Sequence, residues 1–383
     1  MQLDQLFTNE LLFKTDNNQS LILRIQYLDK KNMQLIKVGL CAFGMSGKVF
    51  HAPFLEQHPG FNLVAVVERH KNDSQEKYPH ATIYRSVEEM LKNADLDIVI
   101  VNSPIQTHFD YVKLALEAGK NVICEKPFTI NAAEAKLLVE MAQVRNLFIS
   151  VYQNRRFDRD FLQVKKILSR NVLGDLKEVE IRFDRFRTTM GGKIHKENPQ
   201  LPGSGALHDL GAHLVDQAVQ LFGKPLKIFG DVFAMKGEES ANDYFEVLLF
   251  YPQQLRVRLK SSVFTYEDHY AYKLHGSKGS FLQERTDQQE VELVEGAVPR
   301  YGEQWQKIIS LPDSVLIYLN SDNEKKSESL VSPPGNYMDY YQQIYEHVVF
   351  GYALPSPAEE IIVNMEIIDA ALESSESERV IVI

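Results

Sequence analysis

The sequence has few cysteines and no long uninterrupted apolar segment. Among 383 residues there are only two cysteines, Cys41 and Cys124, each close to the end of an apolar run. We therefore expect buried thiols in a reducing compartment, rather than a disulfide or a metal site. No apolar run approaches the roughly 18 residues of a membrane-spanning helix, and residues 1–34 lack the basic-then-apolar pattern of a secretion signal. These absences predict a cytoplasmic protein that is not inserted in a membrane.

An excess of positive charge is also missing. The formal net charge of -10 would repel a phosphate backbone, which argues against a nucleic-acid partner. The one local basic cluster extends from Arg155–Arg156 to Lys165–Lys166 and is interleaved with acidic and apolar residues. We interpret this cluster as a helix face. The chain is long enough for two domains with a core each, and residues 1–34 form an N-terminal extension of unknown role.

Short apolar runs alternate with helical patterns from residue 35 to about residue 156. Six of these runs are nearly continuous in Val, Ile and Leu, as expected for strands buried on both faces. The expected strands lie within residues 35–42, 62–68, 81–85, 97–103, 121–127 and 147–156. Such alternation is typical of βαβ units. Residues 35–156 are therefore predicted to form an α/β domain with a Rossmann-type, doubly wound parallel sheet.

The pattern changes after this region. Apolar and polar residues alternate with period two within residues 176–187, 226–235, 244–251, 254–264 and 271–277, whereas helical patterns cover 161–170, 205–223, 337–351 and 358–375. Alternation of this kind indicates antiparallel strands with one covered face. Residues 157–383 are therefore predicted to form an α+β domain with a large open, mainly antiparallel sheet. Its second face would be free for a ligand or another subunit.

The stretch "GLCAFGMSGKVFHAPF" connects the first expected strand to a helix. Gly44 and Gly47 keep the second and third glycines of the dinucleotide fingerprint G-x-G-x-x-G, whereas Ala42 replaces the first. Free amides at the start of the following helix would attract phosphates. We predict a cofactor site on Ala42, Phe43, Gly44, Met45, Ser46 and Gly47, with a negative φ at Ala42. The alternative is a tight turn without a ligand.

The second expected strand ends in Glu68, followed by Arg69 and His70. A carboxylate here can accept hydrogen bonds from the adenosine ribose, which favours NAD, whereas Arg69 and His70 could pair with the 2′-phosphate of NADP. Because the carboxylate would repel that phosphate, the expectation is weighted toward NAD. Both cofactors remain open.

Lys126 lies in the tripeptide Glu125–Lys126–Pro127, where the fifth expected strand ends. Ligands of open α/β sheets bind outside the carboxyl ends of the strands, so Lys126 would point toward a nicotinamide. Partial desolvation would lower its pKa and suit it to hydrogen-bond a reacting oxygen. A surface lysine before a proline turn is an equally weighted alternative.

Asp209 and His213 stand four residues apart in an expected helix, so their side chains should be neighbours. A carboxylate beside an imidazole orients the ring and raises its basicity, as a general base requires. The alternative is a solvated polar stripe that also contains Asp216. A metal site through His208 is disfavoured because His208 and His213 project from different faces.

Together these motifs resemble the Gfo/Idh/MocA oxidoreductases, through A-F-G-M-S-G, E-K-P and D-x-x-x-H in this order. The resemblance covers roughly residues 35–383 and is closest to the scyllo-inositol dehydrogenase-like branch, through "VYQNRRFDRDF" and "LHDLGAHLVDQAVQLFG". It implies that Lys126, Asp209 and His213 are catalytic. It also implies that Ser103, Pro104, His108 and Glu125 lie near the cofactor, that Asn154 and Arg155 on the sixth strand lie near the substrate, and that the open sheet face forms a homodimer or larger assembly.

The resulting hypothesis is an NAD(P)-dependent dehydrogenase or reductase acting on a secondary alcohol or ketone of a cyclic polyol or sugar. His213 would remove the hydroxyl proton, Lys126 would hydrogen-bond the developing oxyanion, and Asp209 would orient His213. Lys193 and His195, in a polar loop, would lie within reach of the ligand. One alternative is an enzyme that retains NAD and cleaves a glycoside through transient oxidation. The other is a catalytically silent, nucleotide-sensing protein.

Overall fold

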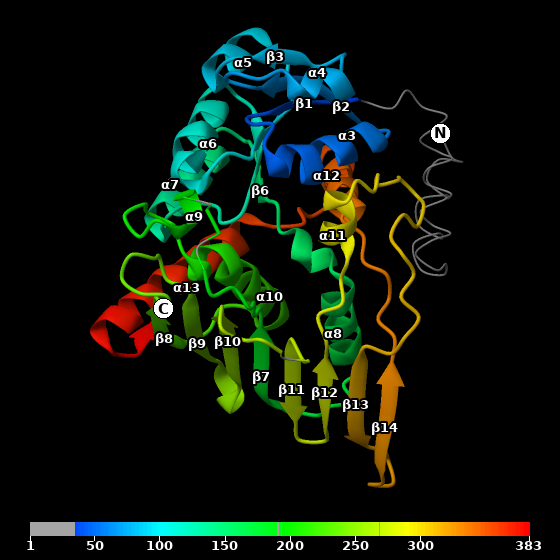
Figure 1. Cartoon of the computed structure of the whole chain (residues 1–383). Helices are drawn as coiled ribbons and strands as arrows, with labels where there is room; N and C mark the ends of the chain where they lie inside the picture. Colours follow the sequence, from blue (N-terminus) through cyan, green and yellow to red (C-terminus); the bar gives the residue numbers. More distant parts are fainter. Residues whose placement is uncertain (1–34, 190, 193, 268) are drawn as a thin grey trace.

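The computed structural model describes residues 35–383 apart from 190, 193 and 268. The extension over residues 1–34, Lys193 and the side chain of His195 lie outside this description. Two β-sheets dominate the structure, sheet A in the N-terminal half and sheet B in the C-terminal half. In Figure 1 sheet A lies above sheet B, with helices between them.

Sheet A has six parallel strands in the order β3-β2-β1-β4-β5-β6. The strands are β1 Ile36–Leu40, β2 Phe61–Val67, β3 Thr82–Tyr84, β4 Ile98–Val101, β5 Asn121–Cys124 and β6 Ile149–Val151. This confirms the predicted Rossmann-type sheet. Strand order reverses between β1 and β4, which opens a crevice at their carboxyl ends where ligands of such folds bind.

Helices connect these strands and cover both faces of the sheet (Figure 1). They are α3 Ala52–Gln57, α4 Asp73–Lys77, α5 Val87–Asn93, α6 His108–Glu117 and α7 Ala132–Val144. Ser86 and Asn131 cap α5 and α7 by accepting hydrogen bonds from backbone amides of Glu89 and Glu134. The short helix α4 was not predicted, because its five residues are too few to show the periodic spacing of apolar residues that indicates a helix.

The sixth strand is shorter than predicted. It ends at Val151, and Asn154 and Arg155 lie in the 3₁₀ turn η3 Asn154–Phe157 instead of on the strand. The prediction that Arg155 and Arg156 form a helix face with Lys165 is also wrong, because both arginines extend into ion pairs with Asp158 and Asp216. The two arginines are therefore paired within the protein and do not form a charged helix face.

Sheet B has nine strands in the order β14-β13-β12-β11-β7-β10-β9-β8-β15, and only the β7–β10 pair is parallel. The strands are β7 Leu176–Arg182, β8 Lys227–Phe233, β9 Tyr244–Phe250, β10 Arg256–Ser262, β11 Tyr272–Gly276, β12 Gly279–Gln283, β13 Ser314–Leu319, β14 Lys325–Leu330 and β15 Ile381–Val382. The large, mainly antiparallel sheet is thus confirmed. Strands β12, β13, β14 and β15 were not predicted, and the edge strand β14, "KKSESL", has no apolar alternation.

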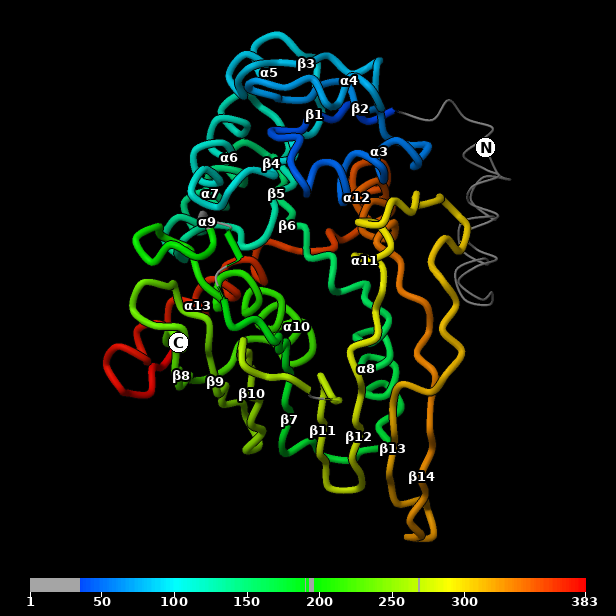
Figure 2. The backbone as a smooth tube through the Cα atoms, viewed as in Figure 1, coloured from blue at the N-terminus to red at the C-terminus, as the bar shows by residue number. Residues whose placement is uncertain are grey.

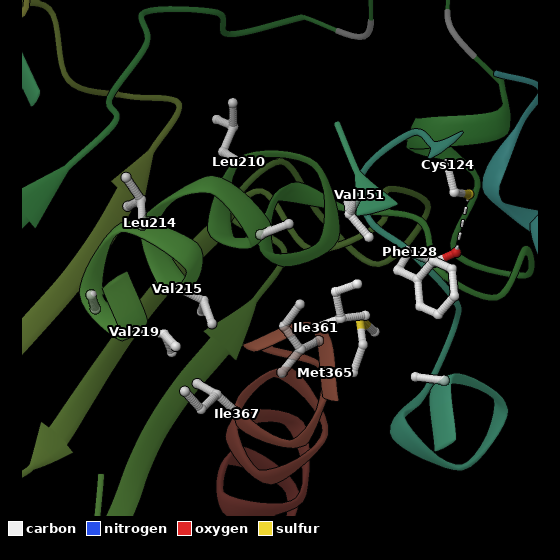
Figure 3. Packing of buried hydrophobic residues seen from close by; sticks show 14 of the residues in the cluster. Cys124, Phe128, Val151, Leu210, Leu214, Val215, Val219, Ile361, Met365 and Ile367 are labelled. Atoms are coloured by element: carbon white, nitrogen blue, oxygen red, sulfur yellow. Dashed lines mark hydrogen bonds between the residues drawn. The ribbon is translucent and has the colours of Figure 1, made fainter. Parts of the chain in front are cut away.

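Three helices cover sheet B: α8 Arg159–Ser169, α10 Ala212–Phe222 and α13 Ala358–Ser377. Figure 3 shows Val215 of α10 directed toward Ile361 and Met365 of α13 in the buried core. Because α13 also contacts α7, the core continues from one sheet to the other. The tube in Figure 2 shows α10 between the two sheets, at the level where the first domain meets the second.

Two shorter helices are α9 Ile194–Glu197 and α11 Gln289–Val294, and a longer one, α12, spans Met338–Phe350. The aromatic stripe of α12 is packing, as its buried Tyr341 stacks on Phe54 of α3 with ring centres 5.4 Å apart. Helix α12 thus joins the C-terminal region to the first domain.

Both cysteines are buried and free, as predicted. Burial raises the pKa of each thiol, and the Cys124 thiol lies 3.8 Å from the carbonyl oxygen of Phe128 (Figure 3). Among the described residues there is no group of three His, Cys, Asp or Glu side chains that could hold a metal ion. No helix in this part of the chain is long and apolar enough to cross a membrane.

The buried imidazole of His58, between β2 and α12, predicts a loss of stability in acid. Its Nε2 lies 3.0 Å from Gln342 Oε1 and its Nδ1 accepts the amide of Gly60 at 3.1 Å, an arrangement that suits the neutral ring. Burial lowers the pKa of His58 to about 4. Between pH 6.5 and 4 the unfolded chain therefore binds a proton that the folded chain excludes, and the free energy of unfolding should fall by about 3 kcal/mol.

Urea unfolding at several pH values, in wild type and His58→Gln, measures this contribution. His108, His208 and His213 also have lowered pKa values and act in the same direction, so the difference between the two proteins isolates His58. We expect the variant to lose less stability than wild type on acidification. Parallel curves over this pH range would contradict the assignment.

Candidate active site

Lys126 and Asp209 meet at the carboxyl edge of sheet A. Lys126 follows β5, whereas Asp209 lies in the π-helical turn η4 Leu207–Gly211 that leads into α10. The Lys126 Nζ donates hydrogen bonds to the Asp209 carbonyl oxygen at 2.7 Å and to its Oδ1 at 3.0 Å. With its side chain 15% exposed, Lys126 is not a surface lysine. The first and second domains therefore meet through this contact.

A second lysine shares the same carboxylate. Lys196 of α9 donates from Nζ to Asp209 Oδ1 at 2.6 Å. Burial opposes ionisation of Asp209, but the two ammonium groups outweigh it and hold the pKa of Asp209 well below 3.8. Burial, with help from Lys196, lowers the pKa of Lys126, while Asp209 opposes this shift. The result is a charged carboxylate that positions two buried or half-buried lysines.

His213 lies one turn further along, on α10, and is buried. Burial, and then the charges of Lys126 and Arg155, hold the pKa of His213 well below 6.5, although Asp209 acts in the opposite direction. Its Nδ1 is buried without a hydrogen-bond partner among the described residues. The ring is thus neutral at neutral pH and able to accept a proton.

The predicted pairing of Asp209 with His213 is not observed in the described part of the chain. The Asp209 carboxylate bonds to the two lysines. Its charge does act to raise the pKa of His213, but burial and Lys126 outweigh it, and the pKa of the ring is lowered. The four-residue spacing assumed an α-helix, but the π-helical turn η4 rotates Asp209 relative to α10. Packing of η4 under the Lys126 turn directs the carboxylate to that lysine instead.

The polar stripe of α10 is not solvated, contrary to the alternative considered for it. Asp216 is buried and accepts hydrogen bonds from Arg156 Nε at 2.7 Å and from Asn364 Nδ2 at 2.9 Å. Arg156 also donates to the Pro355 carbonyl oxygen at 2.6 Å. These buried hydrogen bonds link η3, α10 and α13 and fix the position of α10, the helix that carries His213.

The glycine loop turns as predicted, but with help from a residue that the sequence analysis did not identify. Asn102, directly after β4, accepts the amide of Ala42 at 3.0 Å and donates to its carbonyl oxygen at 2.8 Å. Ala42 is not among the described residues with positive φ, which confirms the prediction for this position. The side-chain amide of Asn102 therefore fixes the turn that a first glycine would otherwise make.

Gly47 and Gly44 are needed for different reasons. A Cβ on Gly47 would lie 2.6 Å from the Ala42 carbonyl oxygen, so the strand and helix pack too closely there for any side chain. A Cβ on Gly44 would meet no atom within 4 Å, and the φ of Gly44 is not positive. Since neither packing nor backbone conformation requires glycine at position 44, the open space above it fits the approach of a pyrophosphate.

Two predicted cofactor residues also make hydrogen bonds within the protein. Ser46 Oγ donates to Glu125 Oε1, which also lies 3.1 Å from His51 Nε2. Tyr341 donates its hydroxyl proton to the Phe50 carbonyl oxygen at 2.6 Å and therefore accepts from His51 Nδ1 at 2.8 Å. Burial opposes ionisation, but His51, Ser46 and Lys126 lower the pKa of Glu125 to about 2. Glu125 thus links the glycine loop to the Lys126 turn, through a histidine that sequence reasoning missed.

Glu68 does not present a free carboxylate at the end of β2. The residue is 6% exposed, and its carboxylate oxygens accept the amides of Asp73 at 2.9 Å and Ser74 at 2.8 Å. The acid caps α4, a helix that the sequence analysis did not predict. Arg69 beside it is exposed and makes no hydrogen bond or ion pair among the described residues.

The other predicted residues surround the Lys126 turn. Pro104 begins the 3₁₀ turn η2 Ile105–Thr107, and Ser103 Oγ accepts a hydrogen bond from Thr107 at 2.7 Å. His108 is buried, with Nε2 2.9 Å from the Ser103 carbonyl oxygen and Nδ1 3.0 Å from that of Pro127. Through these two contacts the His108 ring links the Lys126–Pro127 turn to the segment that follows β4. Asn154 is buried in η3.

Comparison of the sequence with known protein families identifies a nucleotide-binding domain followed by a second domain, in the order observed in the structure. Residues 36–153 match the family described as "Oxidoreductase family, NAD-binding Rossmann fold", and residues 161–282 match the "GFO/IDH/MocA C-terminal domain". The chain is 34% identical to the oxidoreductase YdgJ of Escherichia coli K12, over 89% of this chain and 96% of that protein. It is 31% identical to the NADP⁺-dependent scyllo-inositol 2-dehydrogenase IolW of Bacillus subtilis 168, over 92% and 98%.

A solved structure shares both sheets. The crystal structure of an oxidoreductase from Bacteroides fragilis superposes with a TM-score of 0.81 at 37% sequence identity, covering 91% of this chain and 100% of that chain. Similarity of this extent relates both halves of the molecule, and not the nucleotide-binding half alone, to these proteins.

Proposed function

The chain belongs to the GFO/IDH/MocA oxidoreductase family, and we propose that it transfers a hydride between NAD(P) and a secondary alcohol or ketone of a cyclic polyol or sugar. The observation that carries this proposal is the pairing of Lys126 with Asp209 after the carboxyl end of β5, with the buried His213 one turn further along on α10. The open space above Gly44 supports a dinucleotide in the same crevice.

Each of the three side chains has a distinct role in this proposal. A nicotinamide bound in this crevice would supply the hydride acceptor or donor. The Lys126 ammonium donates a hydrogen bond to the substrate oxygen, and Asp209 holds that ammonium in place. Neutral His213 accepts the hydroxyl proton during oxidation and returns it during reduction, a contribution of about 10²–10⁴-fold to the rate.

A panel of inositols, aldoses and their keto forms, assayed for the absorbance of reduced nicotinamide with NAD and NADP, tests the proposal. Net reduction of the cofactor by a polyol or sugar is the expected result. Release of a sugar from a glycoside without net cofactor reduction would identify the NAD-retaining enzyme instead. Cofactor binding with no turnover of any compound would identify the silent nucleotide-sensing protein.

Arg69 is expected to make NADP the preferred cofactor. The Glu68 carboxylate accepts hydrogen bonds from two amides of α4, and Arg85 donates to the Glu68 carbonyl oxygen at 2.8 Å. The exposed Arg69 and Arg85 therefore place positive charge beside the end of β2. Charge-assisted hydrogen bonds to a 2′-phosphate predict that Arg69→Ala lowers kcat/KM with NADP about 10-fold and leaves kcat/KM with NAD unchanged.

Steady-state kinetics with both cofactors measure this difference. Arg145→Ala, an exposed arginine beyond the end of α7, is the matched control and should change neither value. Equal losses with NAD and NADP in the Arg69 variant would show that Arg69 does not read the 2′-phosphate.

For the assembly, we propose a homodimer formed through the uncovered face of sheet B. Phe229 and Phe233 of β8 are 39% and 45% exposed, on the face opposite the buried Ile228 that packs in the core. Exposed aromatic side chains on an otherwise regular sheet are typical of a protein–protein contact. Light scattering of the purified protein distinguishes this dimer from a monomer.

A further inference from the structure

Three guanidinium groups gather around a single aromatic ring in sheet B. The Cζ atoms of Arg285, Arg155 and Arg185 lie 4.3, 4.8 and 5.5 Å from the ring centre of Phe183, which directly follows β7. The three arginines come from separate segments: η3, the chain after β7 and the chain after β12. Like charges this close repel each other, so the arrangement requires compensation.

Among the described residues, acidic side chains form ion pairs with only one of the three arginines. Arg155 forms ion pairs with Asp158 at 3.2 Å and with Glu290 at 2.5 Å. Within the described part of the chain, no carboxylate lies within ion-pair distance of Arg185 or Arg285. Asp160 and Asp158 act on Arg285 from a greater distance, and Asp209 and Glu290 act on Arg185, but neither guanidinium group has a direct carboxylate partner among the residues that the structure describes.

The hydrogen bonds of Arg285 leave it incompletely satisfied. Its Nη2 donates to the Arg182 carbonyl oxygen at 2.7 Å, while its Nε and Nη1 are buried without a partner among the described residues. Asp160 carries the nearby negative charge, but it accepts hydrogen bonds from Tyr272 at 3.3 Å and from the Thr286 amide at 3.0 Å. A buried guanidinium group with free donors is costly unless a further anion pairs with it.

This cationic cluster adjoins the catalytic residues. Gln217 of α10, one turn beyond His213, donates to the Arg155 carbonyl oxygen at 3.3 Å and lies 3.2 Å from the Tyr272 hydroxyl. The ring of Tyr272 in turn lies 5.3 Å from the Arg285 guanidinium. Arg155 and Arg285 also lower the pKa of His213, after burial and Lys126, as expected for charges close to it. The cluster and His213 therefore line one side of the same site.

We propose that the substrate carries an anionic group, a carboxylate or a phosphate, which Arg185 and Arg285 bind while its reacting carbon lies at Lys126 and His213. This inference rests on the proposed hydride transfer and names the class of its substrate. Guanidinium groups present paired donors that match the two oxygens of a carboxylate or phosphate. Acidic sugars or sugar phosphates therefore fit this site better than neutral polyols.

The test compares neutral sugars with the matching aldonates, uronates and sugar phosphates, using the full-length enzyme with NADP. We expect kcat/KM to be at least about 10-fold higher for one anionic series than for the neutral series, and that series identifies the anion. In Arg185→Gln the anionic-to-neutral ratio should fall at least about 10-fold. The side chain of Arg185 makes no hydrogen bond in the described part of the chain, so the variant should fold, which thermal unfolding checks.

Arg170→Gln is the matched control, because this arginine lies at the far end of α8 and contacts Glu328 of β14. Its anionic-to-neutral ratio should equal that of wild type. Turnover of neutral sugars without preference for anions would overturn this inference and leave the proposed function intact. Arg185-dependent binding of an acidic sugar, detected by calorimetry without turnover, would support the anion site and contradict hydride transfer.

Discussion

Replacement of Lys126 by methionine is expected to lower kcat at least about 10³-fold, because it removes the donor placed to stabilise charge on the substrate oxygen. Methionine has nearly the same length and no charge, so it fills the space of a side chain that is 15% exposed. Asp209 keeps its bond to Lys196 at 2.6 Å and is not left as an unpaired buried carboxylate. The variant should therefore unfold at nearly the wild-type temperature.

Steady-state turnover, together with calorimetric binding of the cofactor, separates the loss of chemistry from a loss of binding. The matched control is Lys196→Met, which removes the other ammonium group bonded to Asp209 and is expected to cost only about 10-fold in kcat. Near-wild-type turnover in Lys126→Met, or equal losses of kcat in both variants, would show that Lys126 does not donate the hydrogen bond that stabilises the reacting oxygen.

Substitution of valine for each of the two glycines in the nucleotide loop is expected to produce a different defect: a loss of stability at Gly47 and a loss of cofactor binding at Gly44. Gly47→Val should lower the free energy of unfolding by about 3 kcal/mol, because its Cβ would lie 2.6 Å from the backbone oxygen of Ala42, which cannot move without breaking the turn. Gly44→Val should leave stability unchanged, since a Cβ there meets no atom within 4 Å. The same side chain would fill the space assigned to the pyrophosphate and weaken cofactor binding about 100-fold.

Urea unfolding and calorimetric titration with NADP, performed on both variants, check the two effects. Each variant is the control for the other, because the same substitution is made at two positions that are three residues apart in one loop. Tight NADP binding by Gly44→Val would mean that the dinucleotide does not lie against this glycine. Wild-type stability of Gly47→Val would mean that the strand and helix tolerate a larger separation.

Most of the fold can be predicted from the sequence because buried strands and amphipathic helices have distinct periods. The Val-rich runs of sheet A and the alternating runs of sheet B both predicted strands that the structure contains. The exceptions are informative. Strands β12 to β15 and helix α4 were not predicted. Strand β14 is polar and largely exposed, β15 has two residues and α4 has five, so their formation depends on pairing and capping by distant segments. Local sequence patterns do not contain that information.

The site was predicted in part. Lys126, Asp209 and His213 stand in recognisable motifs, but the contact between Lys126 and Asp209 depends on how η4 packs beneath β5. The role of Glu68 as a helix cap was hidden because α4 itself was not predicted.

Other residues of the site belong to no motif. His51 is a single histidine in a helix, and only the fold brings it to Glu125 and Tyr341. Arg185 and Arg285 lie beyond the ends of strands whose pairing the sequence does not specify. Arg185 lies within the alternating run 176–187, whereas Arg285 follows β12, a strand that was not predicted, so nothing in the sequence brings the two together.

The central claim is that this chain moves a hydride between a substrate carbon and a nicotinamide, with Lys126 at the reacting oxygen. The most direct measurement uses the best substrate of the panel with deuterium on the carbon that bears the reacting hydroxyl, and mass spectrometry of the cofactor after turnover. The account predicts that wild type yields reduced nicotinamide carrying deuterium, whereas Lys126→Met yields almost none. Turnover of the substrate without deuterium in the cofactor, or equal labelling by both proteins, would contradict it.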